Sequence, residues 1–266
     1  MVCTLGDLLL DVVVRLEAPI AEDTDTYGHT RVGAGGQAAN VAAWVAALGG
    51  RARFVGKRAR DPAGRLVQEE LARHGVEMAG PEVEAGTGTV VSVATPDGKR
   101  TMLSDRGISP DFAPDELDAA WLHDCEWLHV PVYSLAREPL RDTTLRALGL
   151  VPNISLDLSA TVALEQAGVD RIRKLLEGVR MSVVFGTEEE LQLLGPVTAK
   201  TVVTKRGARG CVVTTGSAAR ELPAEPADVV DTTGAGDAFA AGFLVGGPEL
   251  AVRAAARCVE KMGALP

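Results

Sequence analysis

Apolar runs that favour β-strands alternate with helix-prone runs through the middle of this chain. They cover residues 127–130, 139–148, 154–158, 169–176, 182–185, 188–194, 202–204 and 211–214. This alternation predicts βαβ units, in which each helix crosses over between neighbouring parallel strands of one sheet. No repeat of fixed period and no low-complexity linker divides the 266 residues. We therefore expect a single α/β domain covering residues 1–266.

The N-terminal part predicts a strand followed by a buried helix. Residues 8–16 form a β-rich apolar run interrupted by Asp11, and residues 38–48 are rich in alanine and end at Gly49-Gly50. Between these two runs, residues 27–32 alternate in polarity, which suits an edge strand.

A β-hairpin is predicted further along the chain. Residues 89–94 and 100–103 favour β-structure, and they flank Pro96-Asp97-Gly98, whose residues favour a turn. With the strands expected within 12–33, this hairpin at 88–105 predicts a small β-sheet lid inserted into the domain. Because a small sheet with an exposed apolar face is poorly stable alone, we also expect a homodimer formed through the lid.

The charge balance argues against nucleic acid as a partner. The formal net charge is -9 at pH 7 with a sequence pI ≈ 5.0, and no run of Lys and Arg is long enough to follow a phosphate backbone. Hydrophobic residues make up 46% of the chain, which is enough to form a core without metal or disulfide staples.

The cysteines and the N-terminus indicate the compartment. Four scattered cysteines, with no CxxC pair and no His at metal-ligand spacing, are expected to be reduced thiols: Cys3, Cys125, Cys211 and Cys258. The N-terminus reaches Asp7 and Asp11 before an apolar stretch of membrane length accumulates, and it lacks a basic region. We therefore expect a cytoplasmic protein with no signal peptide and no membrane partner.

A glycine-containing turn near the C-terminus carries the clearest chemical signal. The sequence Asp231-Thr232-Thr233-Gly234-Ala235-Gly236-Asp237 precedes an Ala- and Phe-rich run that can open a helix near Ala238. The first N–H groups of a helix lack partners and can bind anions. If they face a transferring phosphoryl group, they stabilise its developing charge, while Asp237 can accept the proton of the attacking hydroxyl. On spacing alone, Asp237 as a simple helix cap is an equal alternative.

A second polar cluster lies nearer the N-terminus. Gly35-Gly36-Gln37-Ala38-Ala39-Asn40 leads into the Ala-rich run, and Asp11 interrupts the strand before it. Carboxylates and amides form the paired donor and acceptor bonds that polyols require. The structural alternatives are a turn residue at a strand end for Asp11 and a helix cap for Asn40.

These two motifs resemble the signatures of the ribokinase-like (PfkB) carbohydrate kinase family. Residues 231–237 match every fixed position of its D-T-x-G-A-G-D signature, and residues 35–40, trailed by Gly49 and Gly56, are similar to its G-G-x-x-x-N signature. The resemblance implies a three-layer α/β core with a mostly parallel sheet and a small lid. It also implies transfer of the γ-phosphate of ATP to a hydroxyl of a small sugar, with ribose as the default.

The resemblance assigns roles around the acceptor. It implies that Asp237 is the general base and that the anion hole is formed by Gly234, Ala235 and Gly236. It implies sugar contacts for Asp11, Gly35, Gly36 and Asn40. It further implies a monovalent cation such as K⁺ beside Asp231 and Thr233.

The nucleotide side matches the family less well. Thr187-Glu188-Glu189-Glu190 corresponds to the family's N-x-x-E motif, so Glu190 remains as a water-mediated Mg²⁺ ligand while Thr187 replaces asparagine. An acidic first helical turn explains Glu190 equally well. Residues 205–210 resemble the family's nucleotide loop, which implies ATP contacts for Lys205, Gly207 and Gly210. A plain hairpin turn is the alternative for this loop.

Other functions fit parts of the sequence. Residues 33–38 satisfy the G-x-G-x-x-A dinucleotide fingerprint, but the leading strand is short and basic residues stand where a ribose-binding acid is needed, which argues against a dehydrogenase. The altered Thr187 stretch keeps a non-catalytic sugar-binding regulator as an alternative, although Asp237 argues against it.

The acceptor is left open by the sequence. Nucleoside kinases share both signatures, so a nucleoside is an alternative acceptor. Gln37 stands where ribokinases commonly carry lysine. Arg106 favours an acidic or phosphorylated sugar, unless it forms an exposed pair with Asp105.

Overall fold

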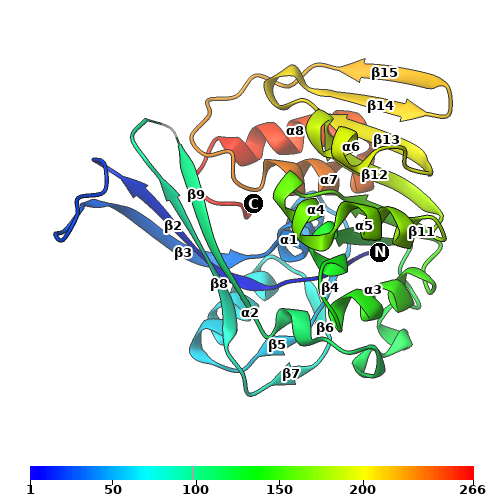
Figure 1. Cartoon of the computed structure of the whole chain (residues 1–266), viewed down its shortest axis with the longest axis horizontal. Helices are drawn as coiled ribbons and strands as arrows, with labels where there is room; N and C mark the ends of the chain where they lie inside the picture. The colour runs from blue at the N-terminus through cyan, green and yellow to red at the C-terminus, as the bar shows by residue number, and fades with distance from the viewer. Residues whose placement is uncertain (98) are drawn as a thin grey trace.

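A nine-stranded, mostly parallel sheet forms the centre of the molecule (Figure 1). The computed structural model describes residues 1–97 and 99–266. The strand order is β15-β14-β13-β12-β11-β10-β1-β4-β6, and only the pairings of β14 with β13 and β15 are antiparallel. These strands are β1 (Val2–Leu5), β4 (Ala52–Val55), β6 (Glu77–Ala79), β10 (Trp127–Pro131), β11 (Asn153–Asp157), β12 (Met181–Thr187), β13 (Ala199–Lys205), β14 (Cys211–Thr215) and β15 (Ala218–Leu222).

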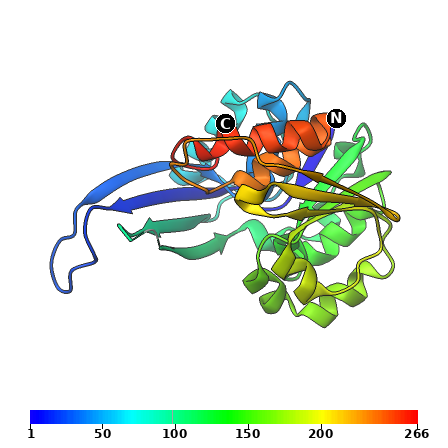
Figure 2. The same ribbon diagram turned by 90° about the horizontal axis from the view of Figure 1, so that it is seen from above.

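Helices cover both faces of this sheet, which gives the three-layer architecture expected from the sequence (Figures 1 and 2). One face is packed by α1 (Gln37–Ala47), α2 (Pro62–Arg73), α7 (Ala235–Gly246) and α8 (Pro248–Val259). The other face is packed by α3 (Leu140–Leu148), α4 (Thr161–Ala167), α5 (Val169–Leu176) and α6 (Glu188–Leu194). Neighbouring strand residues such as Phe54 and Val55 enter opposite cores, because successive side chains of a strand point to opposite faces.

A separate four-stranded sheet projects from one side of the core and forms the lid (Figures 1 and 2). Its order is β3-β2-β8-β9, formed by β2 (Leu9–Leu16), β3 (Gly28–Gly35), β8 (Thr87–Ala94) and β9 (Arg100–Gly107). The antiparallel pairing of β8 with β9 confirms the predicted hairpin, although Gly98 of its turn lies outside the described residues. The short strands β5 (Arg58–Ala59) and β7 (Glu82–Val83) pair in a further two-stranded sheet.

The structure corrects the expected beginning of two elements. The first strand of the chain is β1, which belongs to the large sheet, whereas the predicted strand at 8–16 is β2 of the lid. The predicted helix near Ala238 begins three residues earlier, at Ala235. Gly234 adopts the left-handed conformation with φ 79 and forms the helix N-cap without any side-chain bond, so the helix starts directly after the turn.

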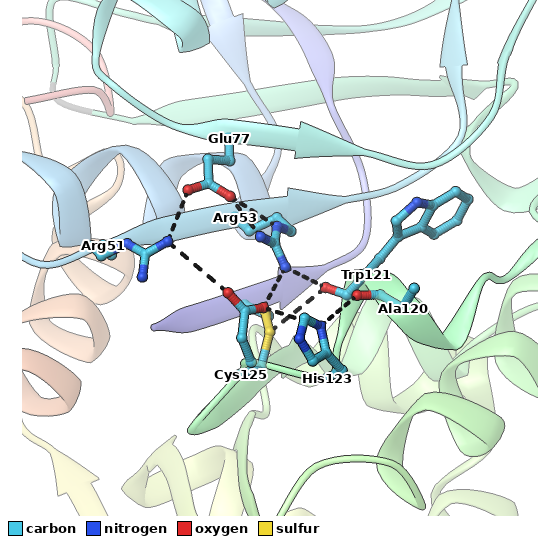
Figure 3. The surroundings of a disulfide bond; sticks show 9 residues. Arg51, Arg53, Glu77, Ala120, Trp121, His123 and Cys125 are labelled. Carbon is cyan, nitrogen blue, oxygen red and sulfur yellow. Dashed lines mark hydrogen bonds and ion pairs between the residues drawn. A yellow bond between two sulfur atoms is a disulfide. The ribbon is translucent and has the colours of Figure 1, made fainter.

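The expectation of four reduced thiols is wrong for two of them. Cys3 and Cys125 form a disulfide across 122 residues, and Figure 3 shows its surroundings. Parallel pairing of Val2 with Trp127 places these distant segments side by side, which no spacing rule could reveal. Arg53 lies nearby and bonds the Glu77 carboxylate at 2.6 Å and the Trp121 carbonyl at 2.7 Å. Cys211 and Cys258 are free and buried, as expected.

Among residues 1–97 and 99–266, no helix combines enough length with enough apolar character to cross a bilayer.

Removal of a central aromatic side chain should measure how much the packing of α7 on the large sheet contributes to stability. Phe185 of β12 is fully buried and packs edge-to-face on Phe239 and Phe243 of α7, with ring centroids 6.2 and 5.3 Å away. Phe185→Ala is expected to lower the free energy of unfolding by about 3–5 kcal/mol in urea denaturation. The control Leu150→Ala, at a side chain that is 43% exposed, should change it by less than about 0.5 kcal/mol. Equal losses in the two variants would contradict this view of the core.

Candidate active site

The first turn of α7 positions the aspartate that ends the second signature. A Cβ added at Gly234 would lie 2.6 Å from the Ala264 Cα, so the αL turn there accepts only glycine. Asp237 is therefore the third residue of the helix, and its side chain does not cap the N-terminus. The capping alternative for Asp237 is thus wrong.

The start of α7 also presents free backbone donors. The Ala235 N–H bonds to the Thr232 carbonyl at 3.3 Å, and the next backbone bond from the helix is made by Ala238 to Gly234. Within the described part of the chain, the N–H groups of Gly236 and Asp237 have no backbone acceptor. Unpartnered donors at the positive end of a helix form an anion site, so Gly236 offers a donor whereas Ala235 is already engaged.

A buried hydrogen bond joins the two signatures. Asn40 donates from Nδ2 to Asp237 Oδ2 over 2.8 Å, and both residues are buried. Asn40 lies inside α1, whose N-cap is Gly36, so the capping alternative for Asn40 is also wrong. Its buried Oδ1 has no hydrogen-bond partner among the described residues. An unpaired buried amide oxygen is costly, and a ligand hydroxyl would satisfy it.

Burial sets the protonation of Asp237. Its desolvation raises the pKa from 3.8 to about 7, while the Asn40 hydrogen bond lowers it and the charge of Asp157 raises it further. A carboxylate whose pKa lies near the working pH is well matched to act as a general base.

Asp11 faces a pocket beneath the lid. Burial raises the pKa of Asp11 to about 6, against the lowering effect of Arg106. The pocket is lined by residues of β2, β3, α2 and the C-terminal segment, including Asp11, Arg31, Glu70 and Gly263. The Asp11 carboxyl group lies against Gly35, where any Cβ would overlap it. Gly35 ends β3 and Gly36 caps α1, so the glycine pair joins lid and core at the pocket.

Arg106 has partners that the sequence did not reveal. It forms an ion pair with the buried carboxylate of Asp7, and its guanidinium lies 4.0 Å from the centre of the Tyr133 ring. Asp105 instead accepts a bond from the Gly107 N–H at 2.9 Å, so the expected Arg106–Asp105 pair is absent from the described residues. Asp7 and Tyr133 escaped prediction because their partner comes from a lid strand far along the chain.

Lys205 lies between the carboxylates and the anion site. Its Nζ is 2.9 Å from both oxygens of Asp157, at the end of β11, and 3.5 Å from the place of a Cβ on Gly236. Burial lowers the pKa of Lys205, but Asp157 and Glu190 outweigh it and raise the pKa above its ordinary value. Asp157 was not predicted, although an acidic residue at the carboxyl end of a parallel strand marks the place where α/β proteins bind ligands.

Thr187 and Glu190 form a capping box at the start of α6. Glu190 accepts from the Thr187 N–H at 2.8 Å, and Thr187 Oγ1 accepts from the Glu190 N–H at 3.2 Å. Thr187 thus supplies the cap that asparagine could also supply. Glu190 is buried, and this burial raises its pKa.

The loop after β13 is a hairpin connection. Gly207 opens a 3₁₀ turn and Gly210 ends it with φ 81, between the antiparallel strands β13 and β14. The loop is fixed to α6 by Arg206, whose Nε lies 2.9 Å from Glu188. The hairpin turn proposed as the alternative is therefore present in the structure. The same loop begins directly after Lys205, the last residue of β13.

Asp231 and Thr233 brace the signature turn. Asp231 Oδ1 accepts from the Thr233 N–H at 2.9 Å and from its hydroxyl at 2.7 Å, while Oδ2 accepts from the Gly263 N–H at 3.0 Å. These bonds outweigh burial and lower the pKa of Asp231. Within residues 1–97 and 99–266, no group of three or more His, Cys, Asp or Glu side chains could hold a metal ion by itself.

Comparison with known proteins identifies this arrangement. The model of the family described as pfkB family carbohydrate kinase matches residues 1–265. A fructokinase from Klebsiella pneumoniae is 30% identical over 263 residues, covering 91% of this chain and 82% of the relative. A fructokinase from Salmonella typhimurium is 31% identical over 264 residues, covering 91% and 83%.

Solved structures share the fold. An adenosine kinase from Sinorhizobium meliloti superimposes with a TM-score of 0.88 at 22% identity, covering 100% of this chain and 95% of that one. An uncharacterized sugar kinase from Pyrococcus horikoshii in complex with ATP gives a TM-score of 0.84 at 24% identity, covering 99% and 94%. With the family model spanning nearly every residue, the chain belongs to the pfkB family of carbohydrate kinases and is a phosphotransferase with an alcohol group as acceptor.

Proposed function

We propose that the chain transfers the γ-phosphoryl group of ATP to a hydroxyl of a neutral sugar, with Asp237 as general base. The observation that carries this proposal is the buried Asn40–Asp237 bond beside the free N–H groups of the α7 N-terminus. A base and an anion site on the same helical turn are the two elements that phosphoryl transfer to a hydroxyl needs.

The balance of charges favours a neutral acceptor. Arg106 lowers the pKa of Asp11, but its guanidinium is already paired with Asp7. Asp11 and Glu70 are two carboxylates in the pocket lining. The guanidinium in that lining belongs to Arg31, which donates to the Met262 carbonyl. An acidic or phosphorylated sugar would therefore meet more carboxylates than guanidinium groups in the pocket lining. The names of the Klebsiella and Salmonella relatives make fructose the first acceptor to test, beside ribose.

The chain's own groups accept the proton and stabilise part of the developing charge. The acceptor hydroxyl gives its proton to the Asp237 carboxylate as the new O–P bond forms and the bond to the ADP leaving group breaks. Asn40 Oδ1 and Asp11 orient the sugar, while the N–H of Gly236 stabilises the transferring phosphoryl group. Lys205, with Gly207 and Gly210 after it, faces the nucleotide phosphates.

The buried carboxylates beside Lys205 suit a hydrated Mg²⁺ ion. Glu190 and Asp157 provide oxygen atoms of the kind that Mg²⁺ prefers, and we propose contact through water because Lys205 and the capping box already engage them. When bound with ATP, Mg²⁺ neutralises charge on the phosphates.

A nucleoside is the second candidate acceptor. The likeness to the adenosine kinase from Sinorhizobium meliloti concerns the fold, and both signatures are compatible with such a substrate. A screen of the purified protein with ATP against fructose, ribose, sugar acids, sugar phosphates and nucleosides tests the proposal. Turnover confined to anionic sugars or nucleosides would reject the neutral sugar.

Asp237→Asn should separate binding from chemistry. Asparagine keeps the shape and can still accept from Asn40, but it cannot take a proton, so kcat is expected to fall by about 100-fold or more with little change in the sugar KM. Because the buried carboxylate has a raised pKa, the folded state of the wild type loses stability as pH rises from 3.8 to about 7 and loses no more above that, so the variant should melt no lower than wild type at alkaline pH. A variant with near-wild-type kcat would remove Asp237 from the role of base.

The rate should also follow the protonation of Asp237. With its pKa raised to about 7 in the free protein, kcat/KM is expected to rise about tenfold per pH unit below that value and to level off above it. Asp11 titrates nearby, at about 6, so the profile should be repeated in Asp11→Asn. An inflection near 7 that survives in this variant belongs to Asp237, whereas a flat profile in wild type would contradict the assignment.

We further propose that residues 1–266 act as one domain whose lid pairs with a second lid in a homodimer. Large apolar side chains are exposed on both edge strands, with Leu103 of β9 60% exposed and Val32 of β3 50% exposed. Exposed edges of this kind favour association. Sedimentation at micromolar concentration should give a dimer mass that Leu103→Asp converts to monomer, while Leu150→Asp far from the lid does not. A monomeric wild type would refute the dimer.

A further inference from the structure

Two lid arginines reach the loops that brace the phosphoryl site. Arg31 of β3 donates to the Met262 carbonyl, and Arg100 of β9 donates to Thr233 Oγ1 at 2.6 Å. β3 and β9 are the two edge strands of the lid sheet, so one arginine from each edge contacts the core. The two receiving segments are themselves joined, because the Gly263 N–H donates to Asp231.

The oxygens around Asp231 are already occupied by donors. Its own carboxylate accepts three hydrogen bonds from Thr233 and Gly263. The Thr233 carbonyl accepts from Cys258 Sγ at 3.4 Å, and the Ala264 carbonyl accepts from the Trp44 indole at 2.8 Å. A monovalent cation would have to share these oxygens with donors that are held in place by the core.

Positive charge is already present at the same place. Arg100 Nη1 lies 3.8 Å from Asp231 Oδ1, and the Arg31 guanidinium lies 3.6 Å from the place of a Cβ on Gly263. A K⁺ ion bound to Asp231 or to the Met262 carbonyl would stand beside a guanidinium at contact distance, where like charges repel. The cation that the family resemblance implies beside Asp231 and Thr233 therefore does not fit the residues of this chain.

We propose that Arg31 and Arg100 supply, from the lid, the positive charge that a monovalent cation would supply, so that turnover does not require K⁺. The proposal rests on the proposed role of residues 231–237 as the phosphoryl site. Arg100 acts through Thr233, directly before the anion-site turn, and is thus a positioning residue. A guanidinium stays charged at every pH at which the protein is folded, so this charge is permanent.

Cation dependence tests the proposal directly. At constant ionic strength, exchange of choline chloride for potassium chloride should change kcat of the wild type by less than about 2-fold, since only general screening differs. The melting temperature should be the same in the two salts, because a bound cation would raise it. A kcat that depends on K⁺, or a rise in melting temperature specific to K⁺, would overturn the proposal.

Variants of Arg100 test the arginine itself. Arg100→Met removes the charge while keeping the length, and it should lower kcat by about 10-fold or more with little change in the sugar KM. Added K⁺ or free guanidinium should restore part of the loss, and Arg100→Lys should retain most of the rate. Arg15→Met, at an exposed arginine of strand β2 in the same lid sheet, is the control and should behave as wild type. Equal kcat in Arg100→Met and Arg15→Met would refute the role of Arg100.

These outcomes are distinct from failure of the proposed function. If neither salt supports turnover with any sugar, the sugar-kinase activity itself is refuted, while the melting temperatures still report whether K⁺ binds.

Discussion

The desolvated carboxylate of Asp237 is the group on which the arrangement of the active site depends. Burial removes solvation from its ionised form, which raises the pKa from 3.8 to about 7. The fold offsets this cost with the Asn40 hydrogen bond and the positive end of α7. Because α1 and α7 pack together in one core, Asp237 and Asn40 are held by the same contacts that stabilise the fold.

The polar residues of the site were predictable where both members of a contact lie in a motif. Asp237 and Asn40 were identified from their signatures, but only the structure shows that both lie inside helices rather than at caps. Asp7, Tyr133 and Asp157 were missed because each contacts a partner that lies far away in the sequence. Contacts of that kind depend on topology, which local patterns do not contain.

The elements of the fold were likewise predicted only where the local sequence carries a clear pattern. Alternating apolar and helical runs predicted the parallel strands from β10 to β13, because buried parallel strands read as continuous apolar segments. β1 and β4 are only four residues long, and α2 has a polar composition, so these elements carried too little pattern to be recognised. The disulfide between Cys3 and Cys125 was not predicted because the two cysteines are 122 residues apart in sequence and come together only when β1 pairs with β10.

The lid lines the pocket and contacts the signature turn through one sheet. The pairing of β2 with β3 sets Asp11 opposite Gly33, and the carboxylate then extends over Gly35, where no side chain could be tolerated. The same β3 carries Arg31 to the C-terminal segment, while β9 carries Arg100 to the signature turn. A shift of the lid by one residue would move all three side chains to the other face, because side chains alternate along a strand. The register of this small sheet therefore fixes the positions of the Asp11 carboxylate and of the two guanidinium groups together.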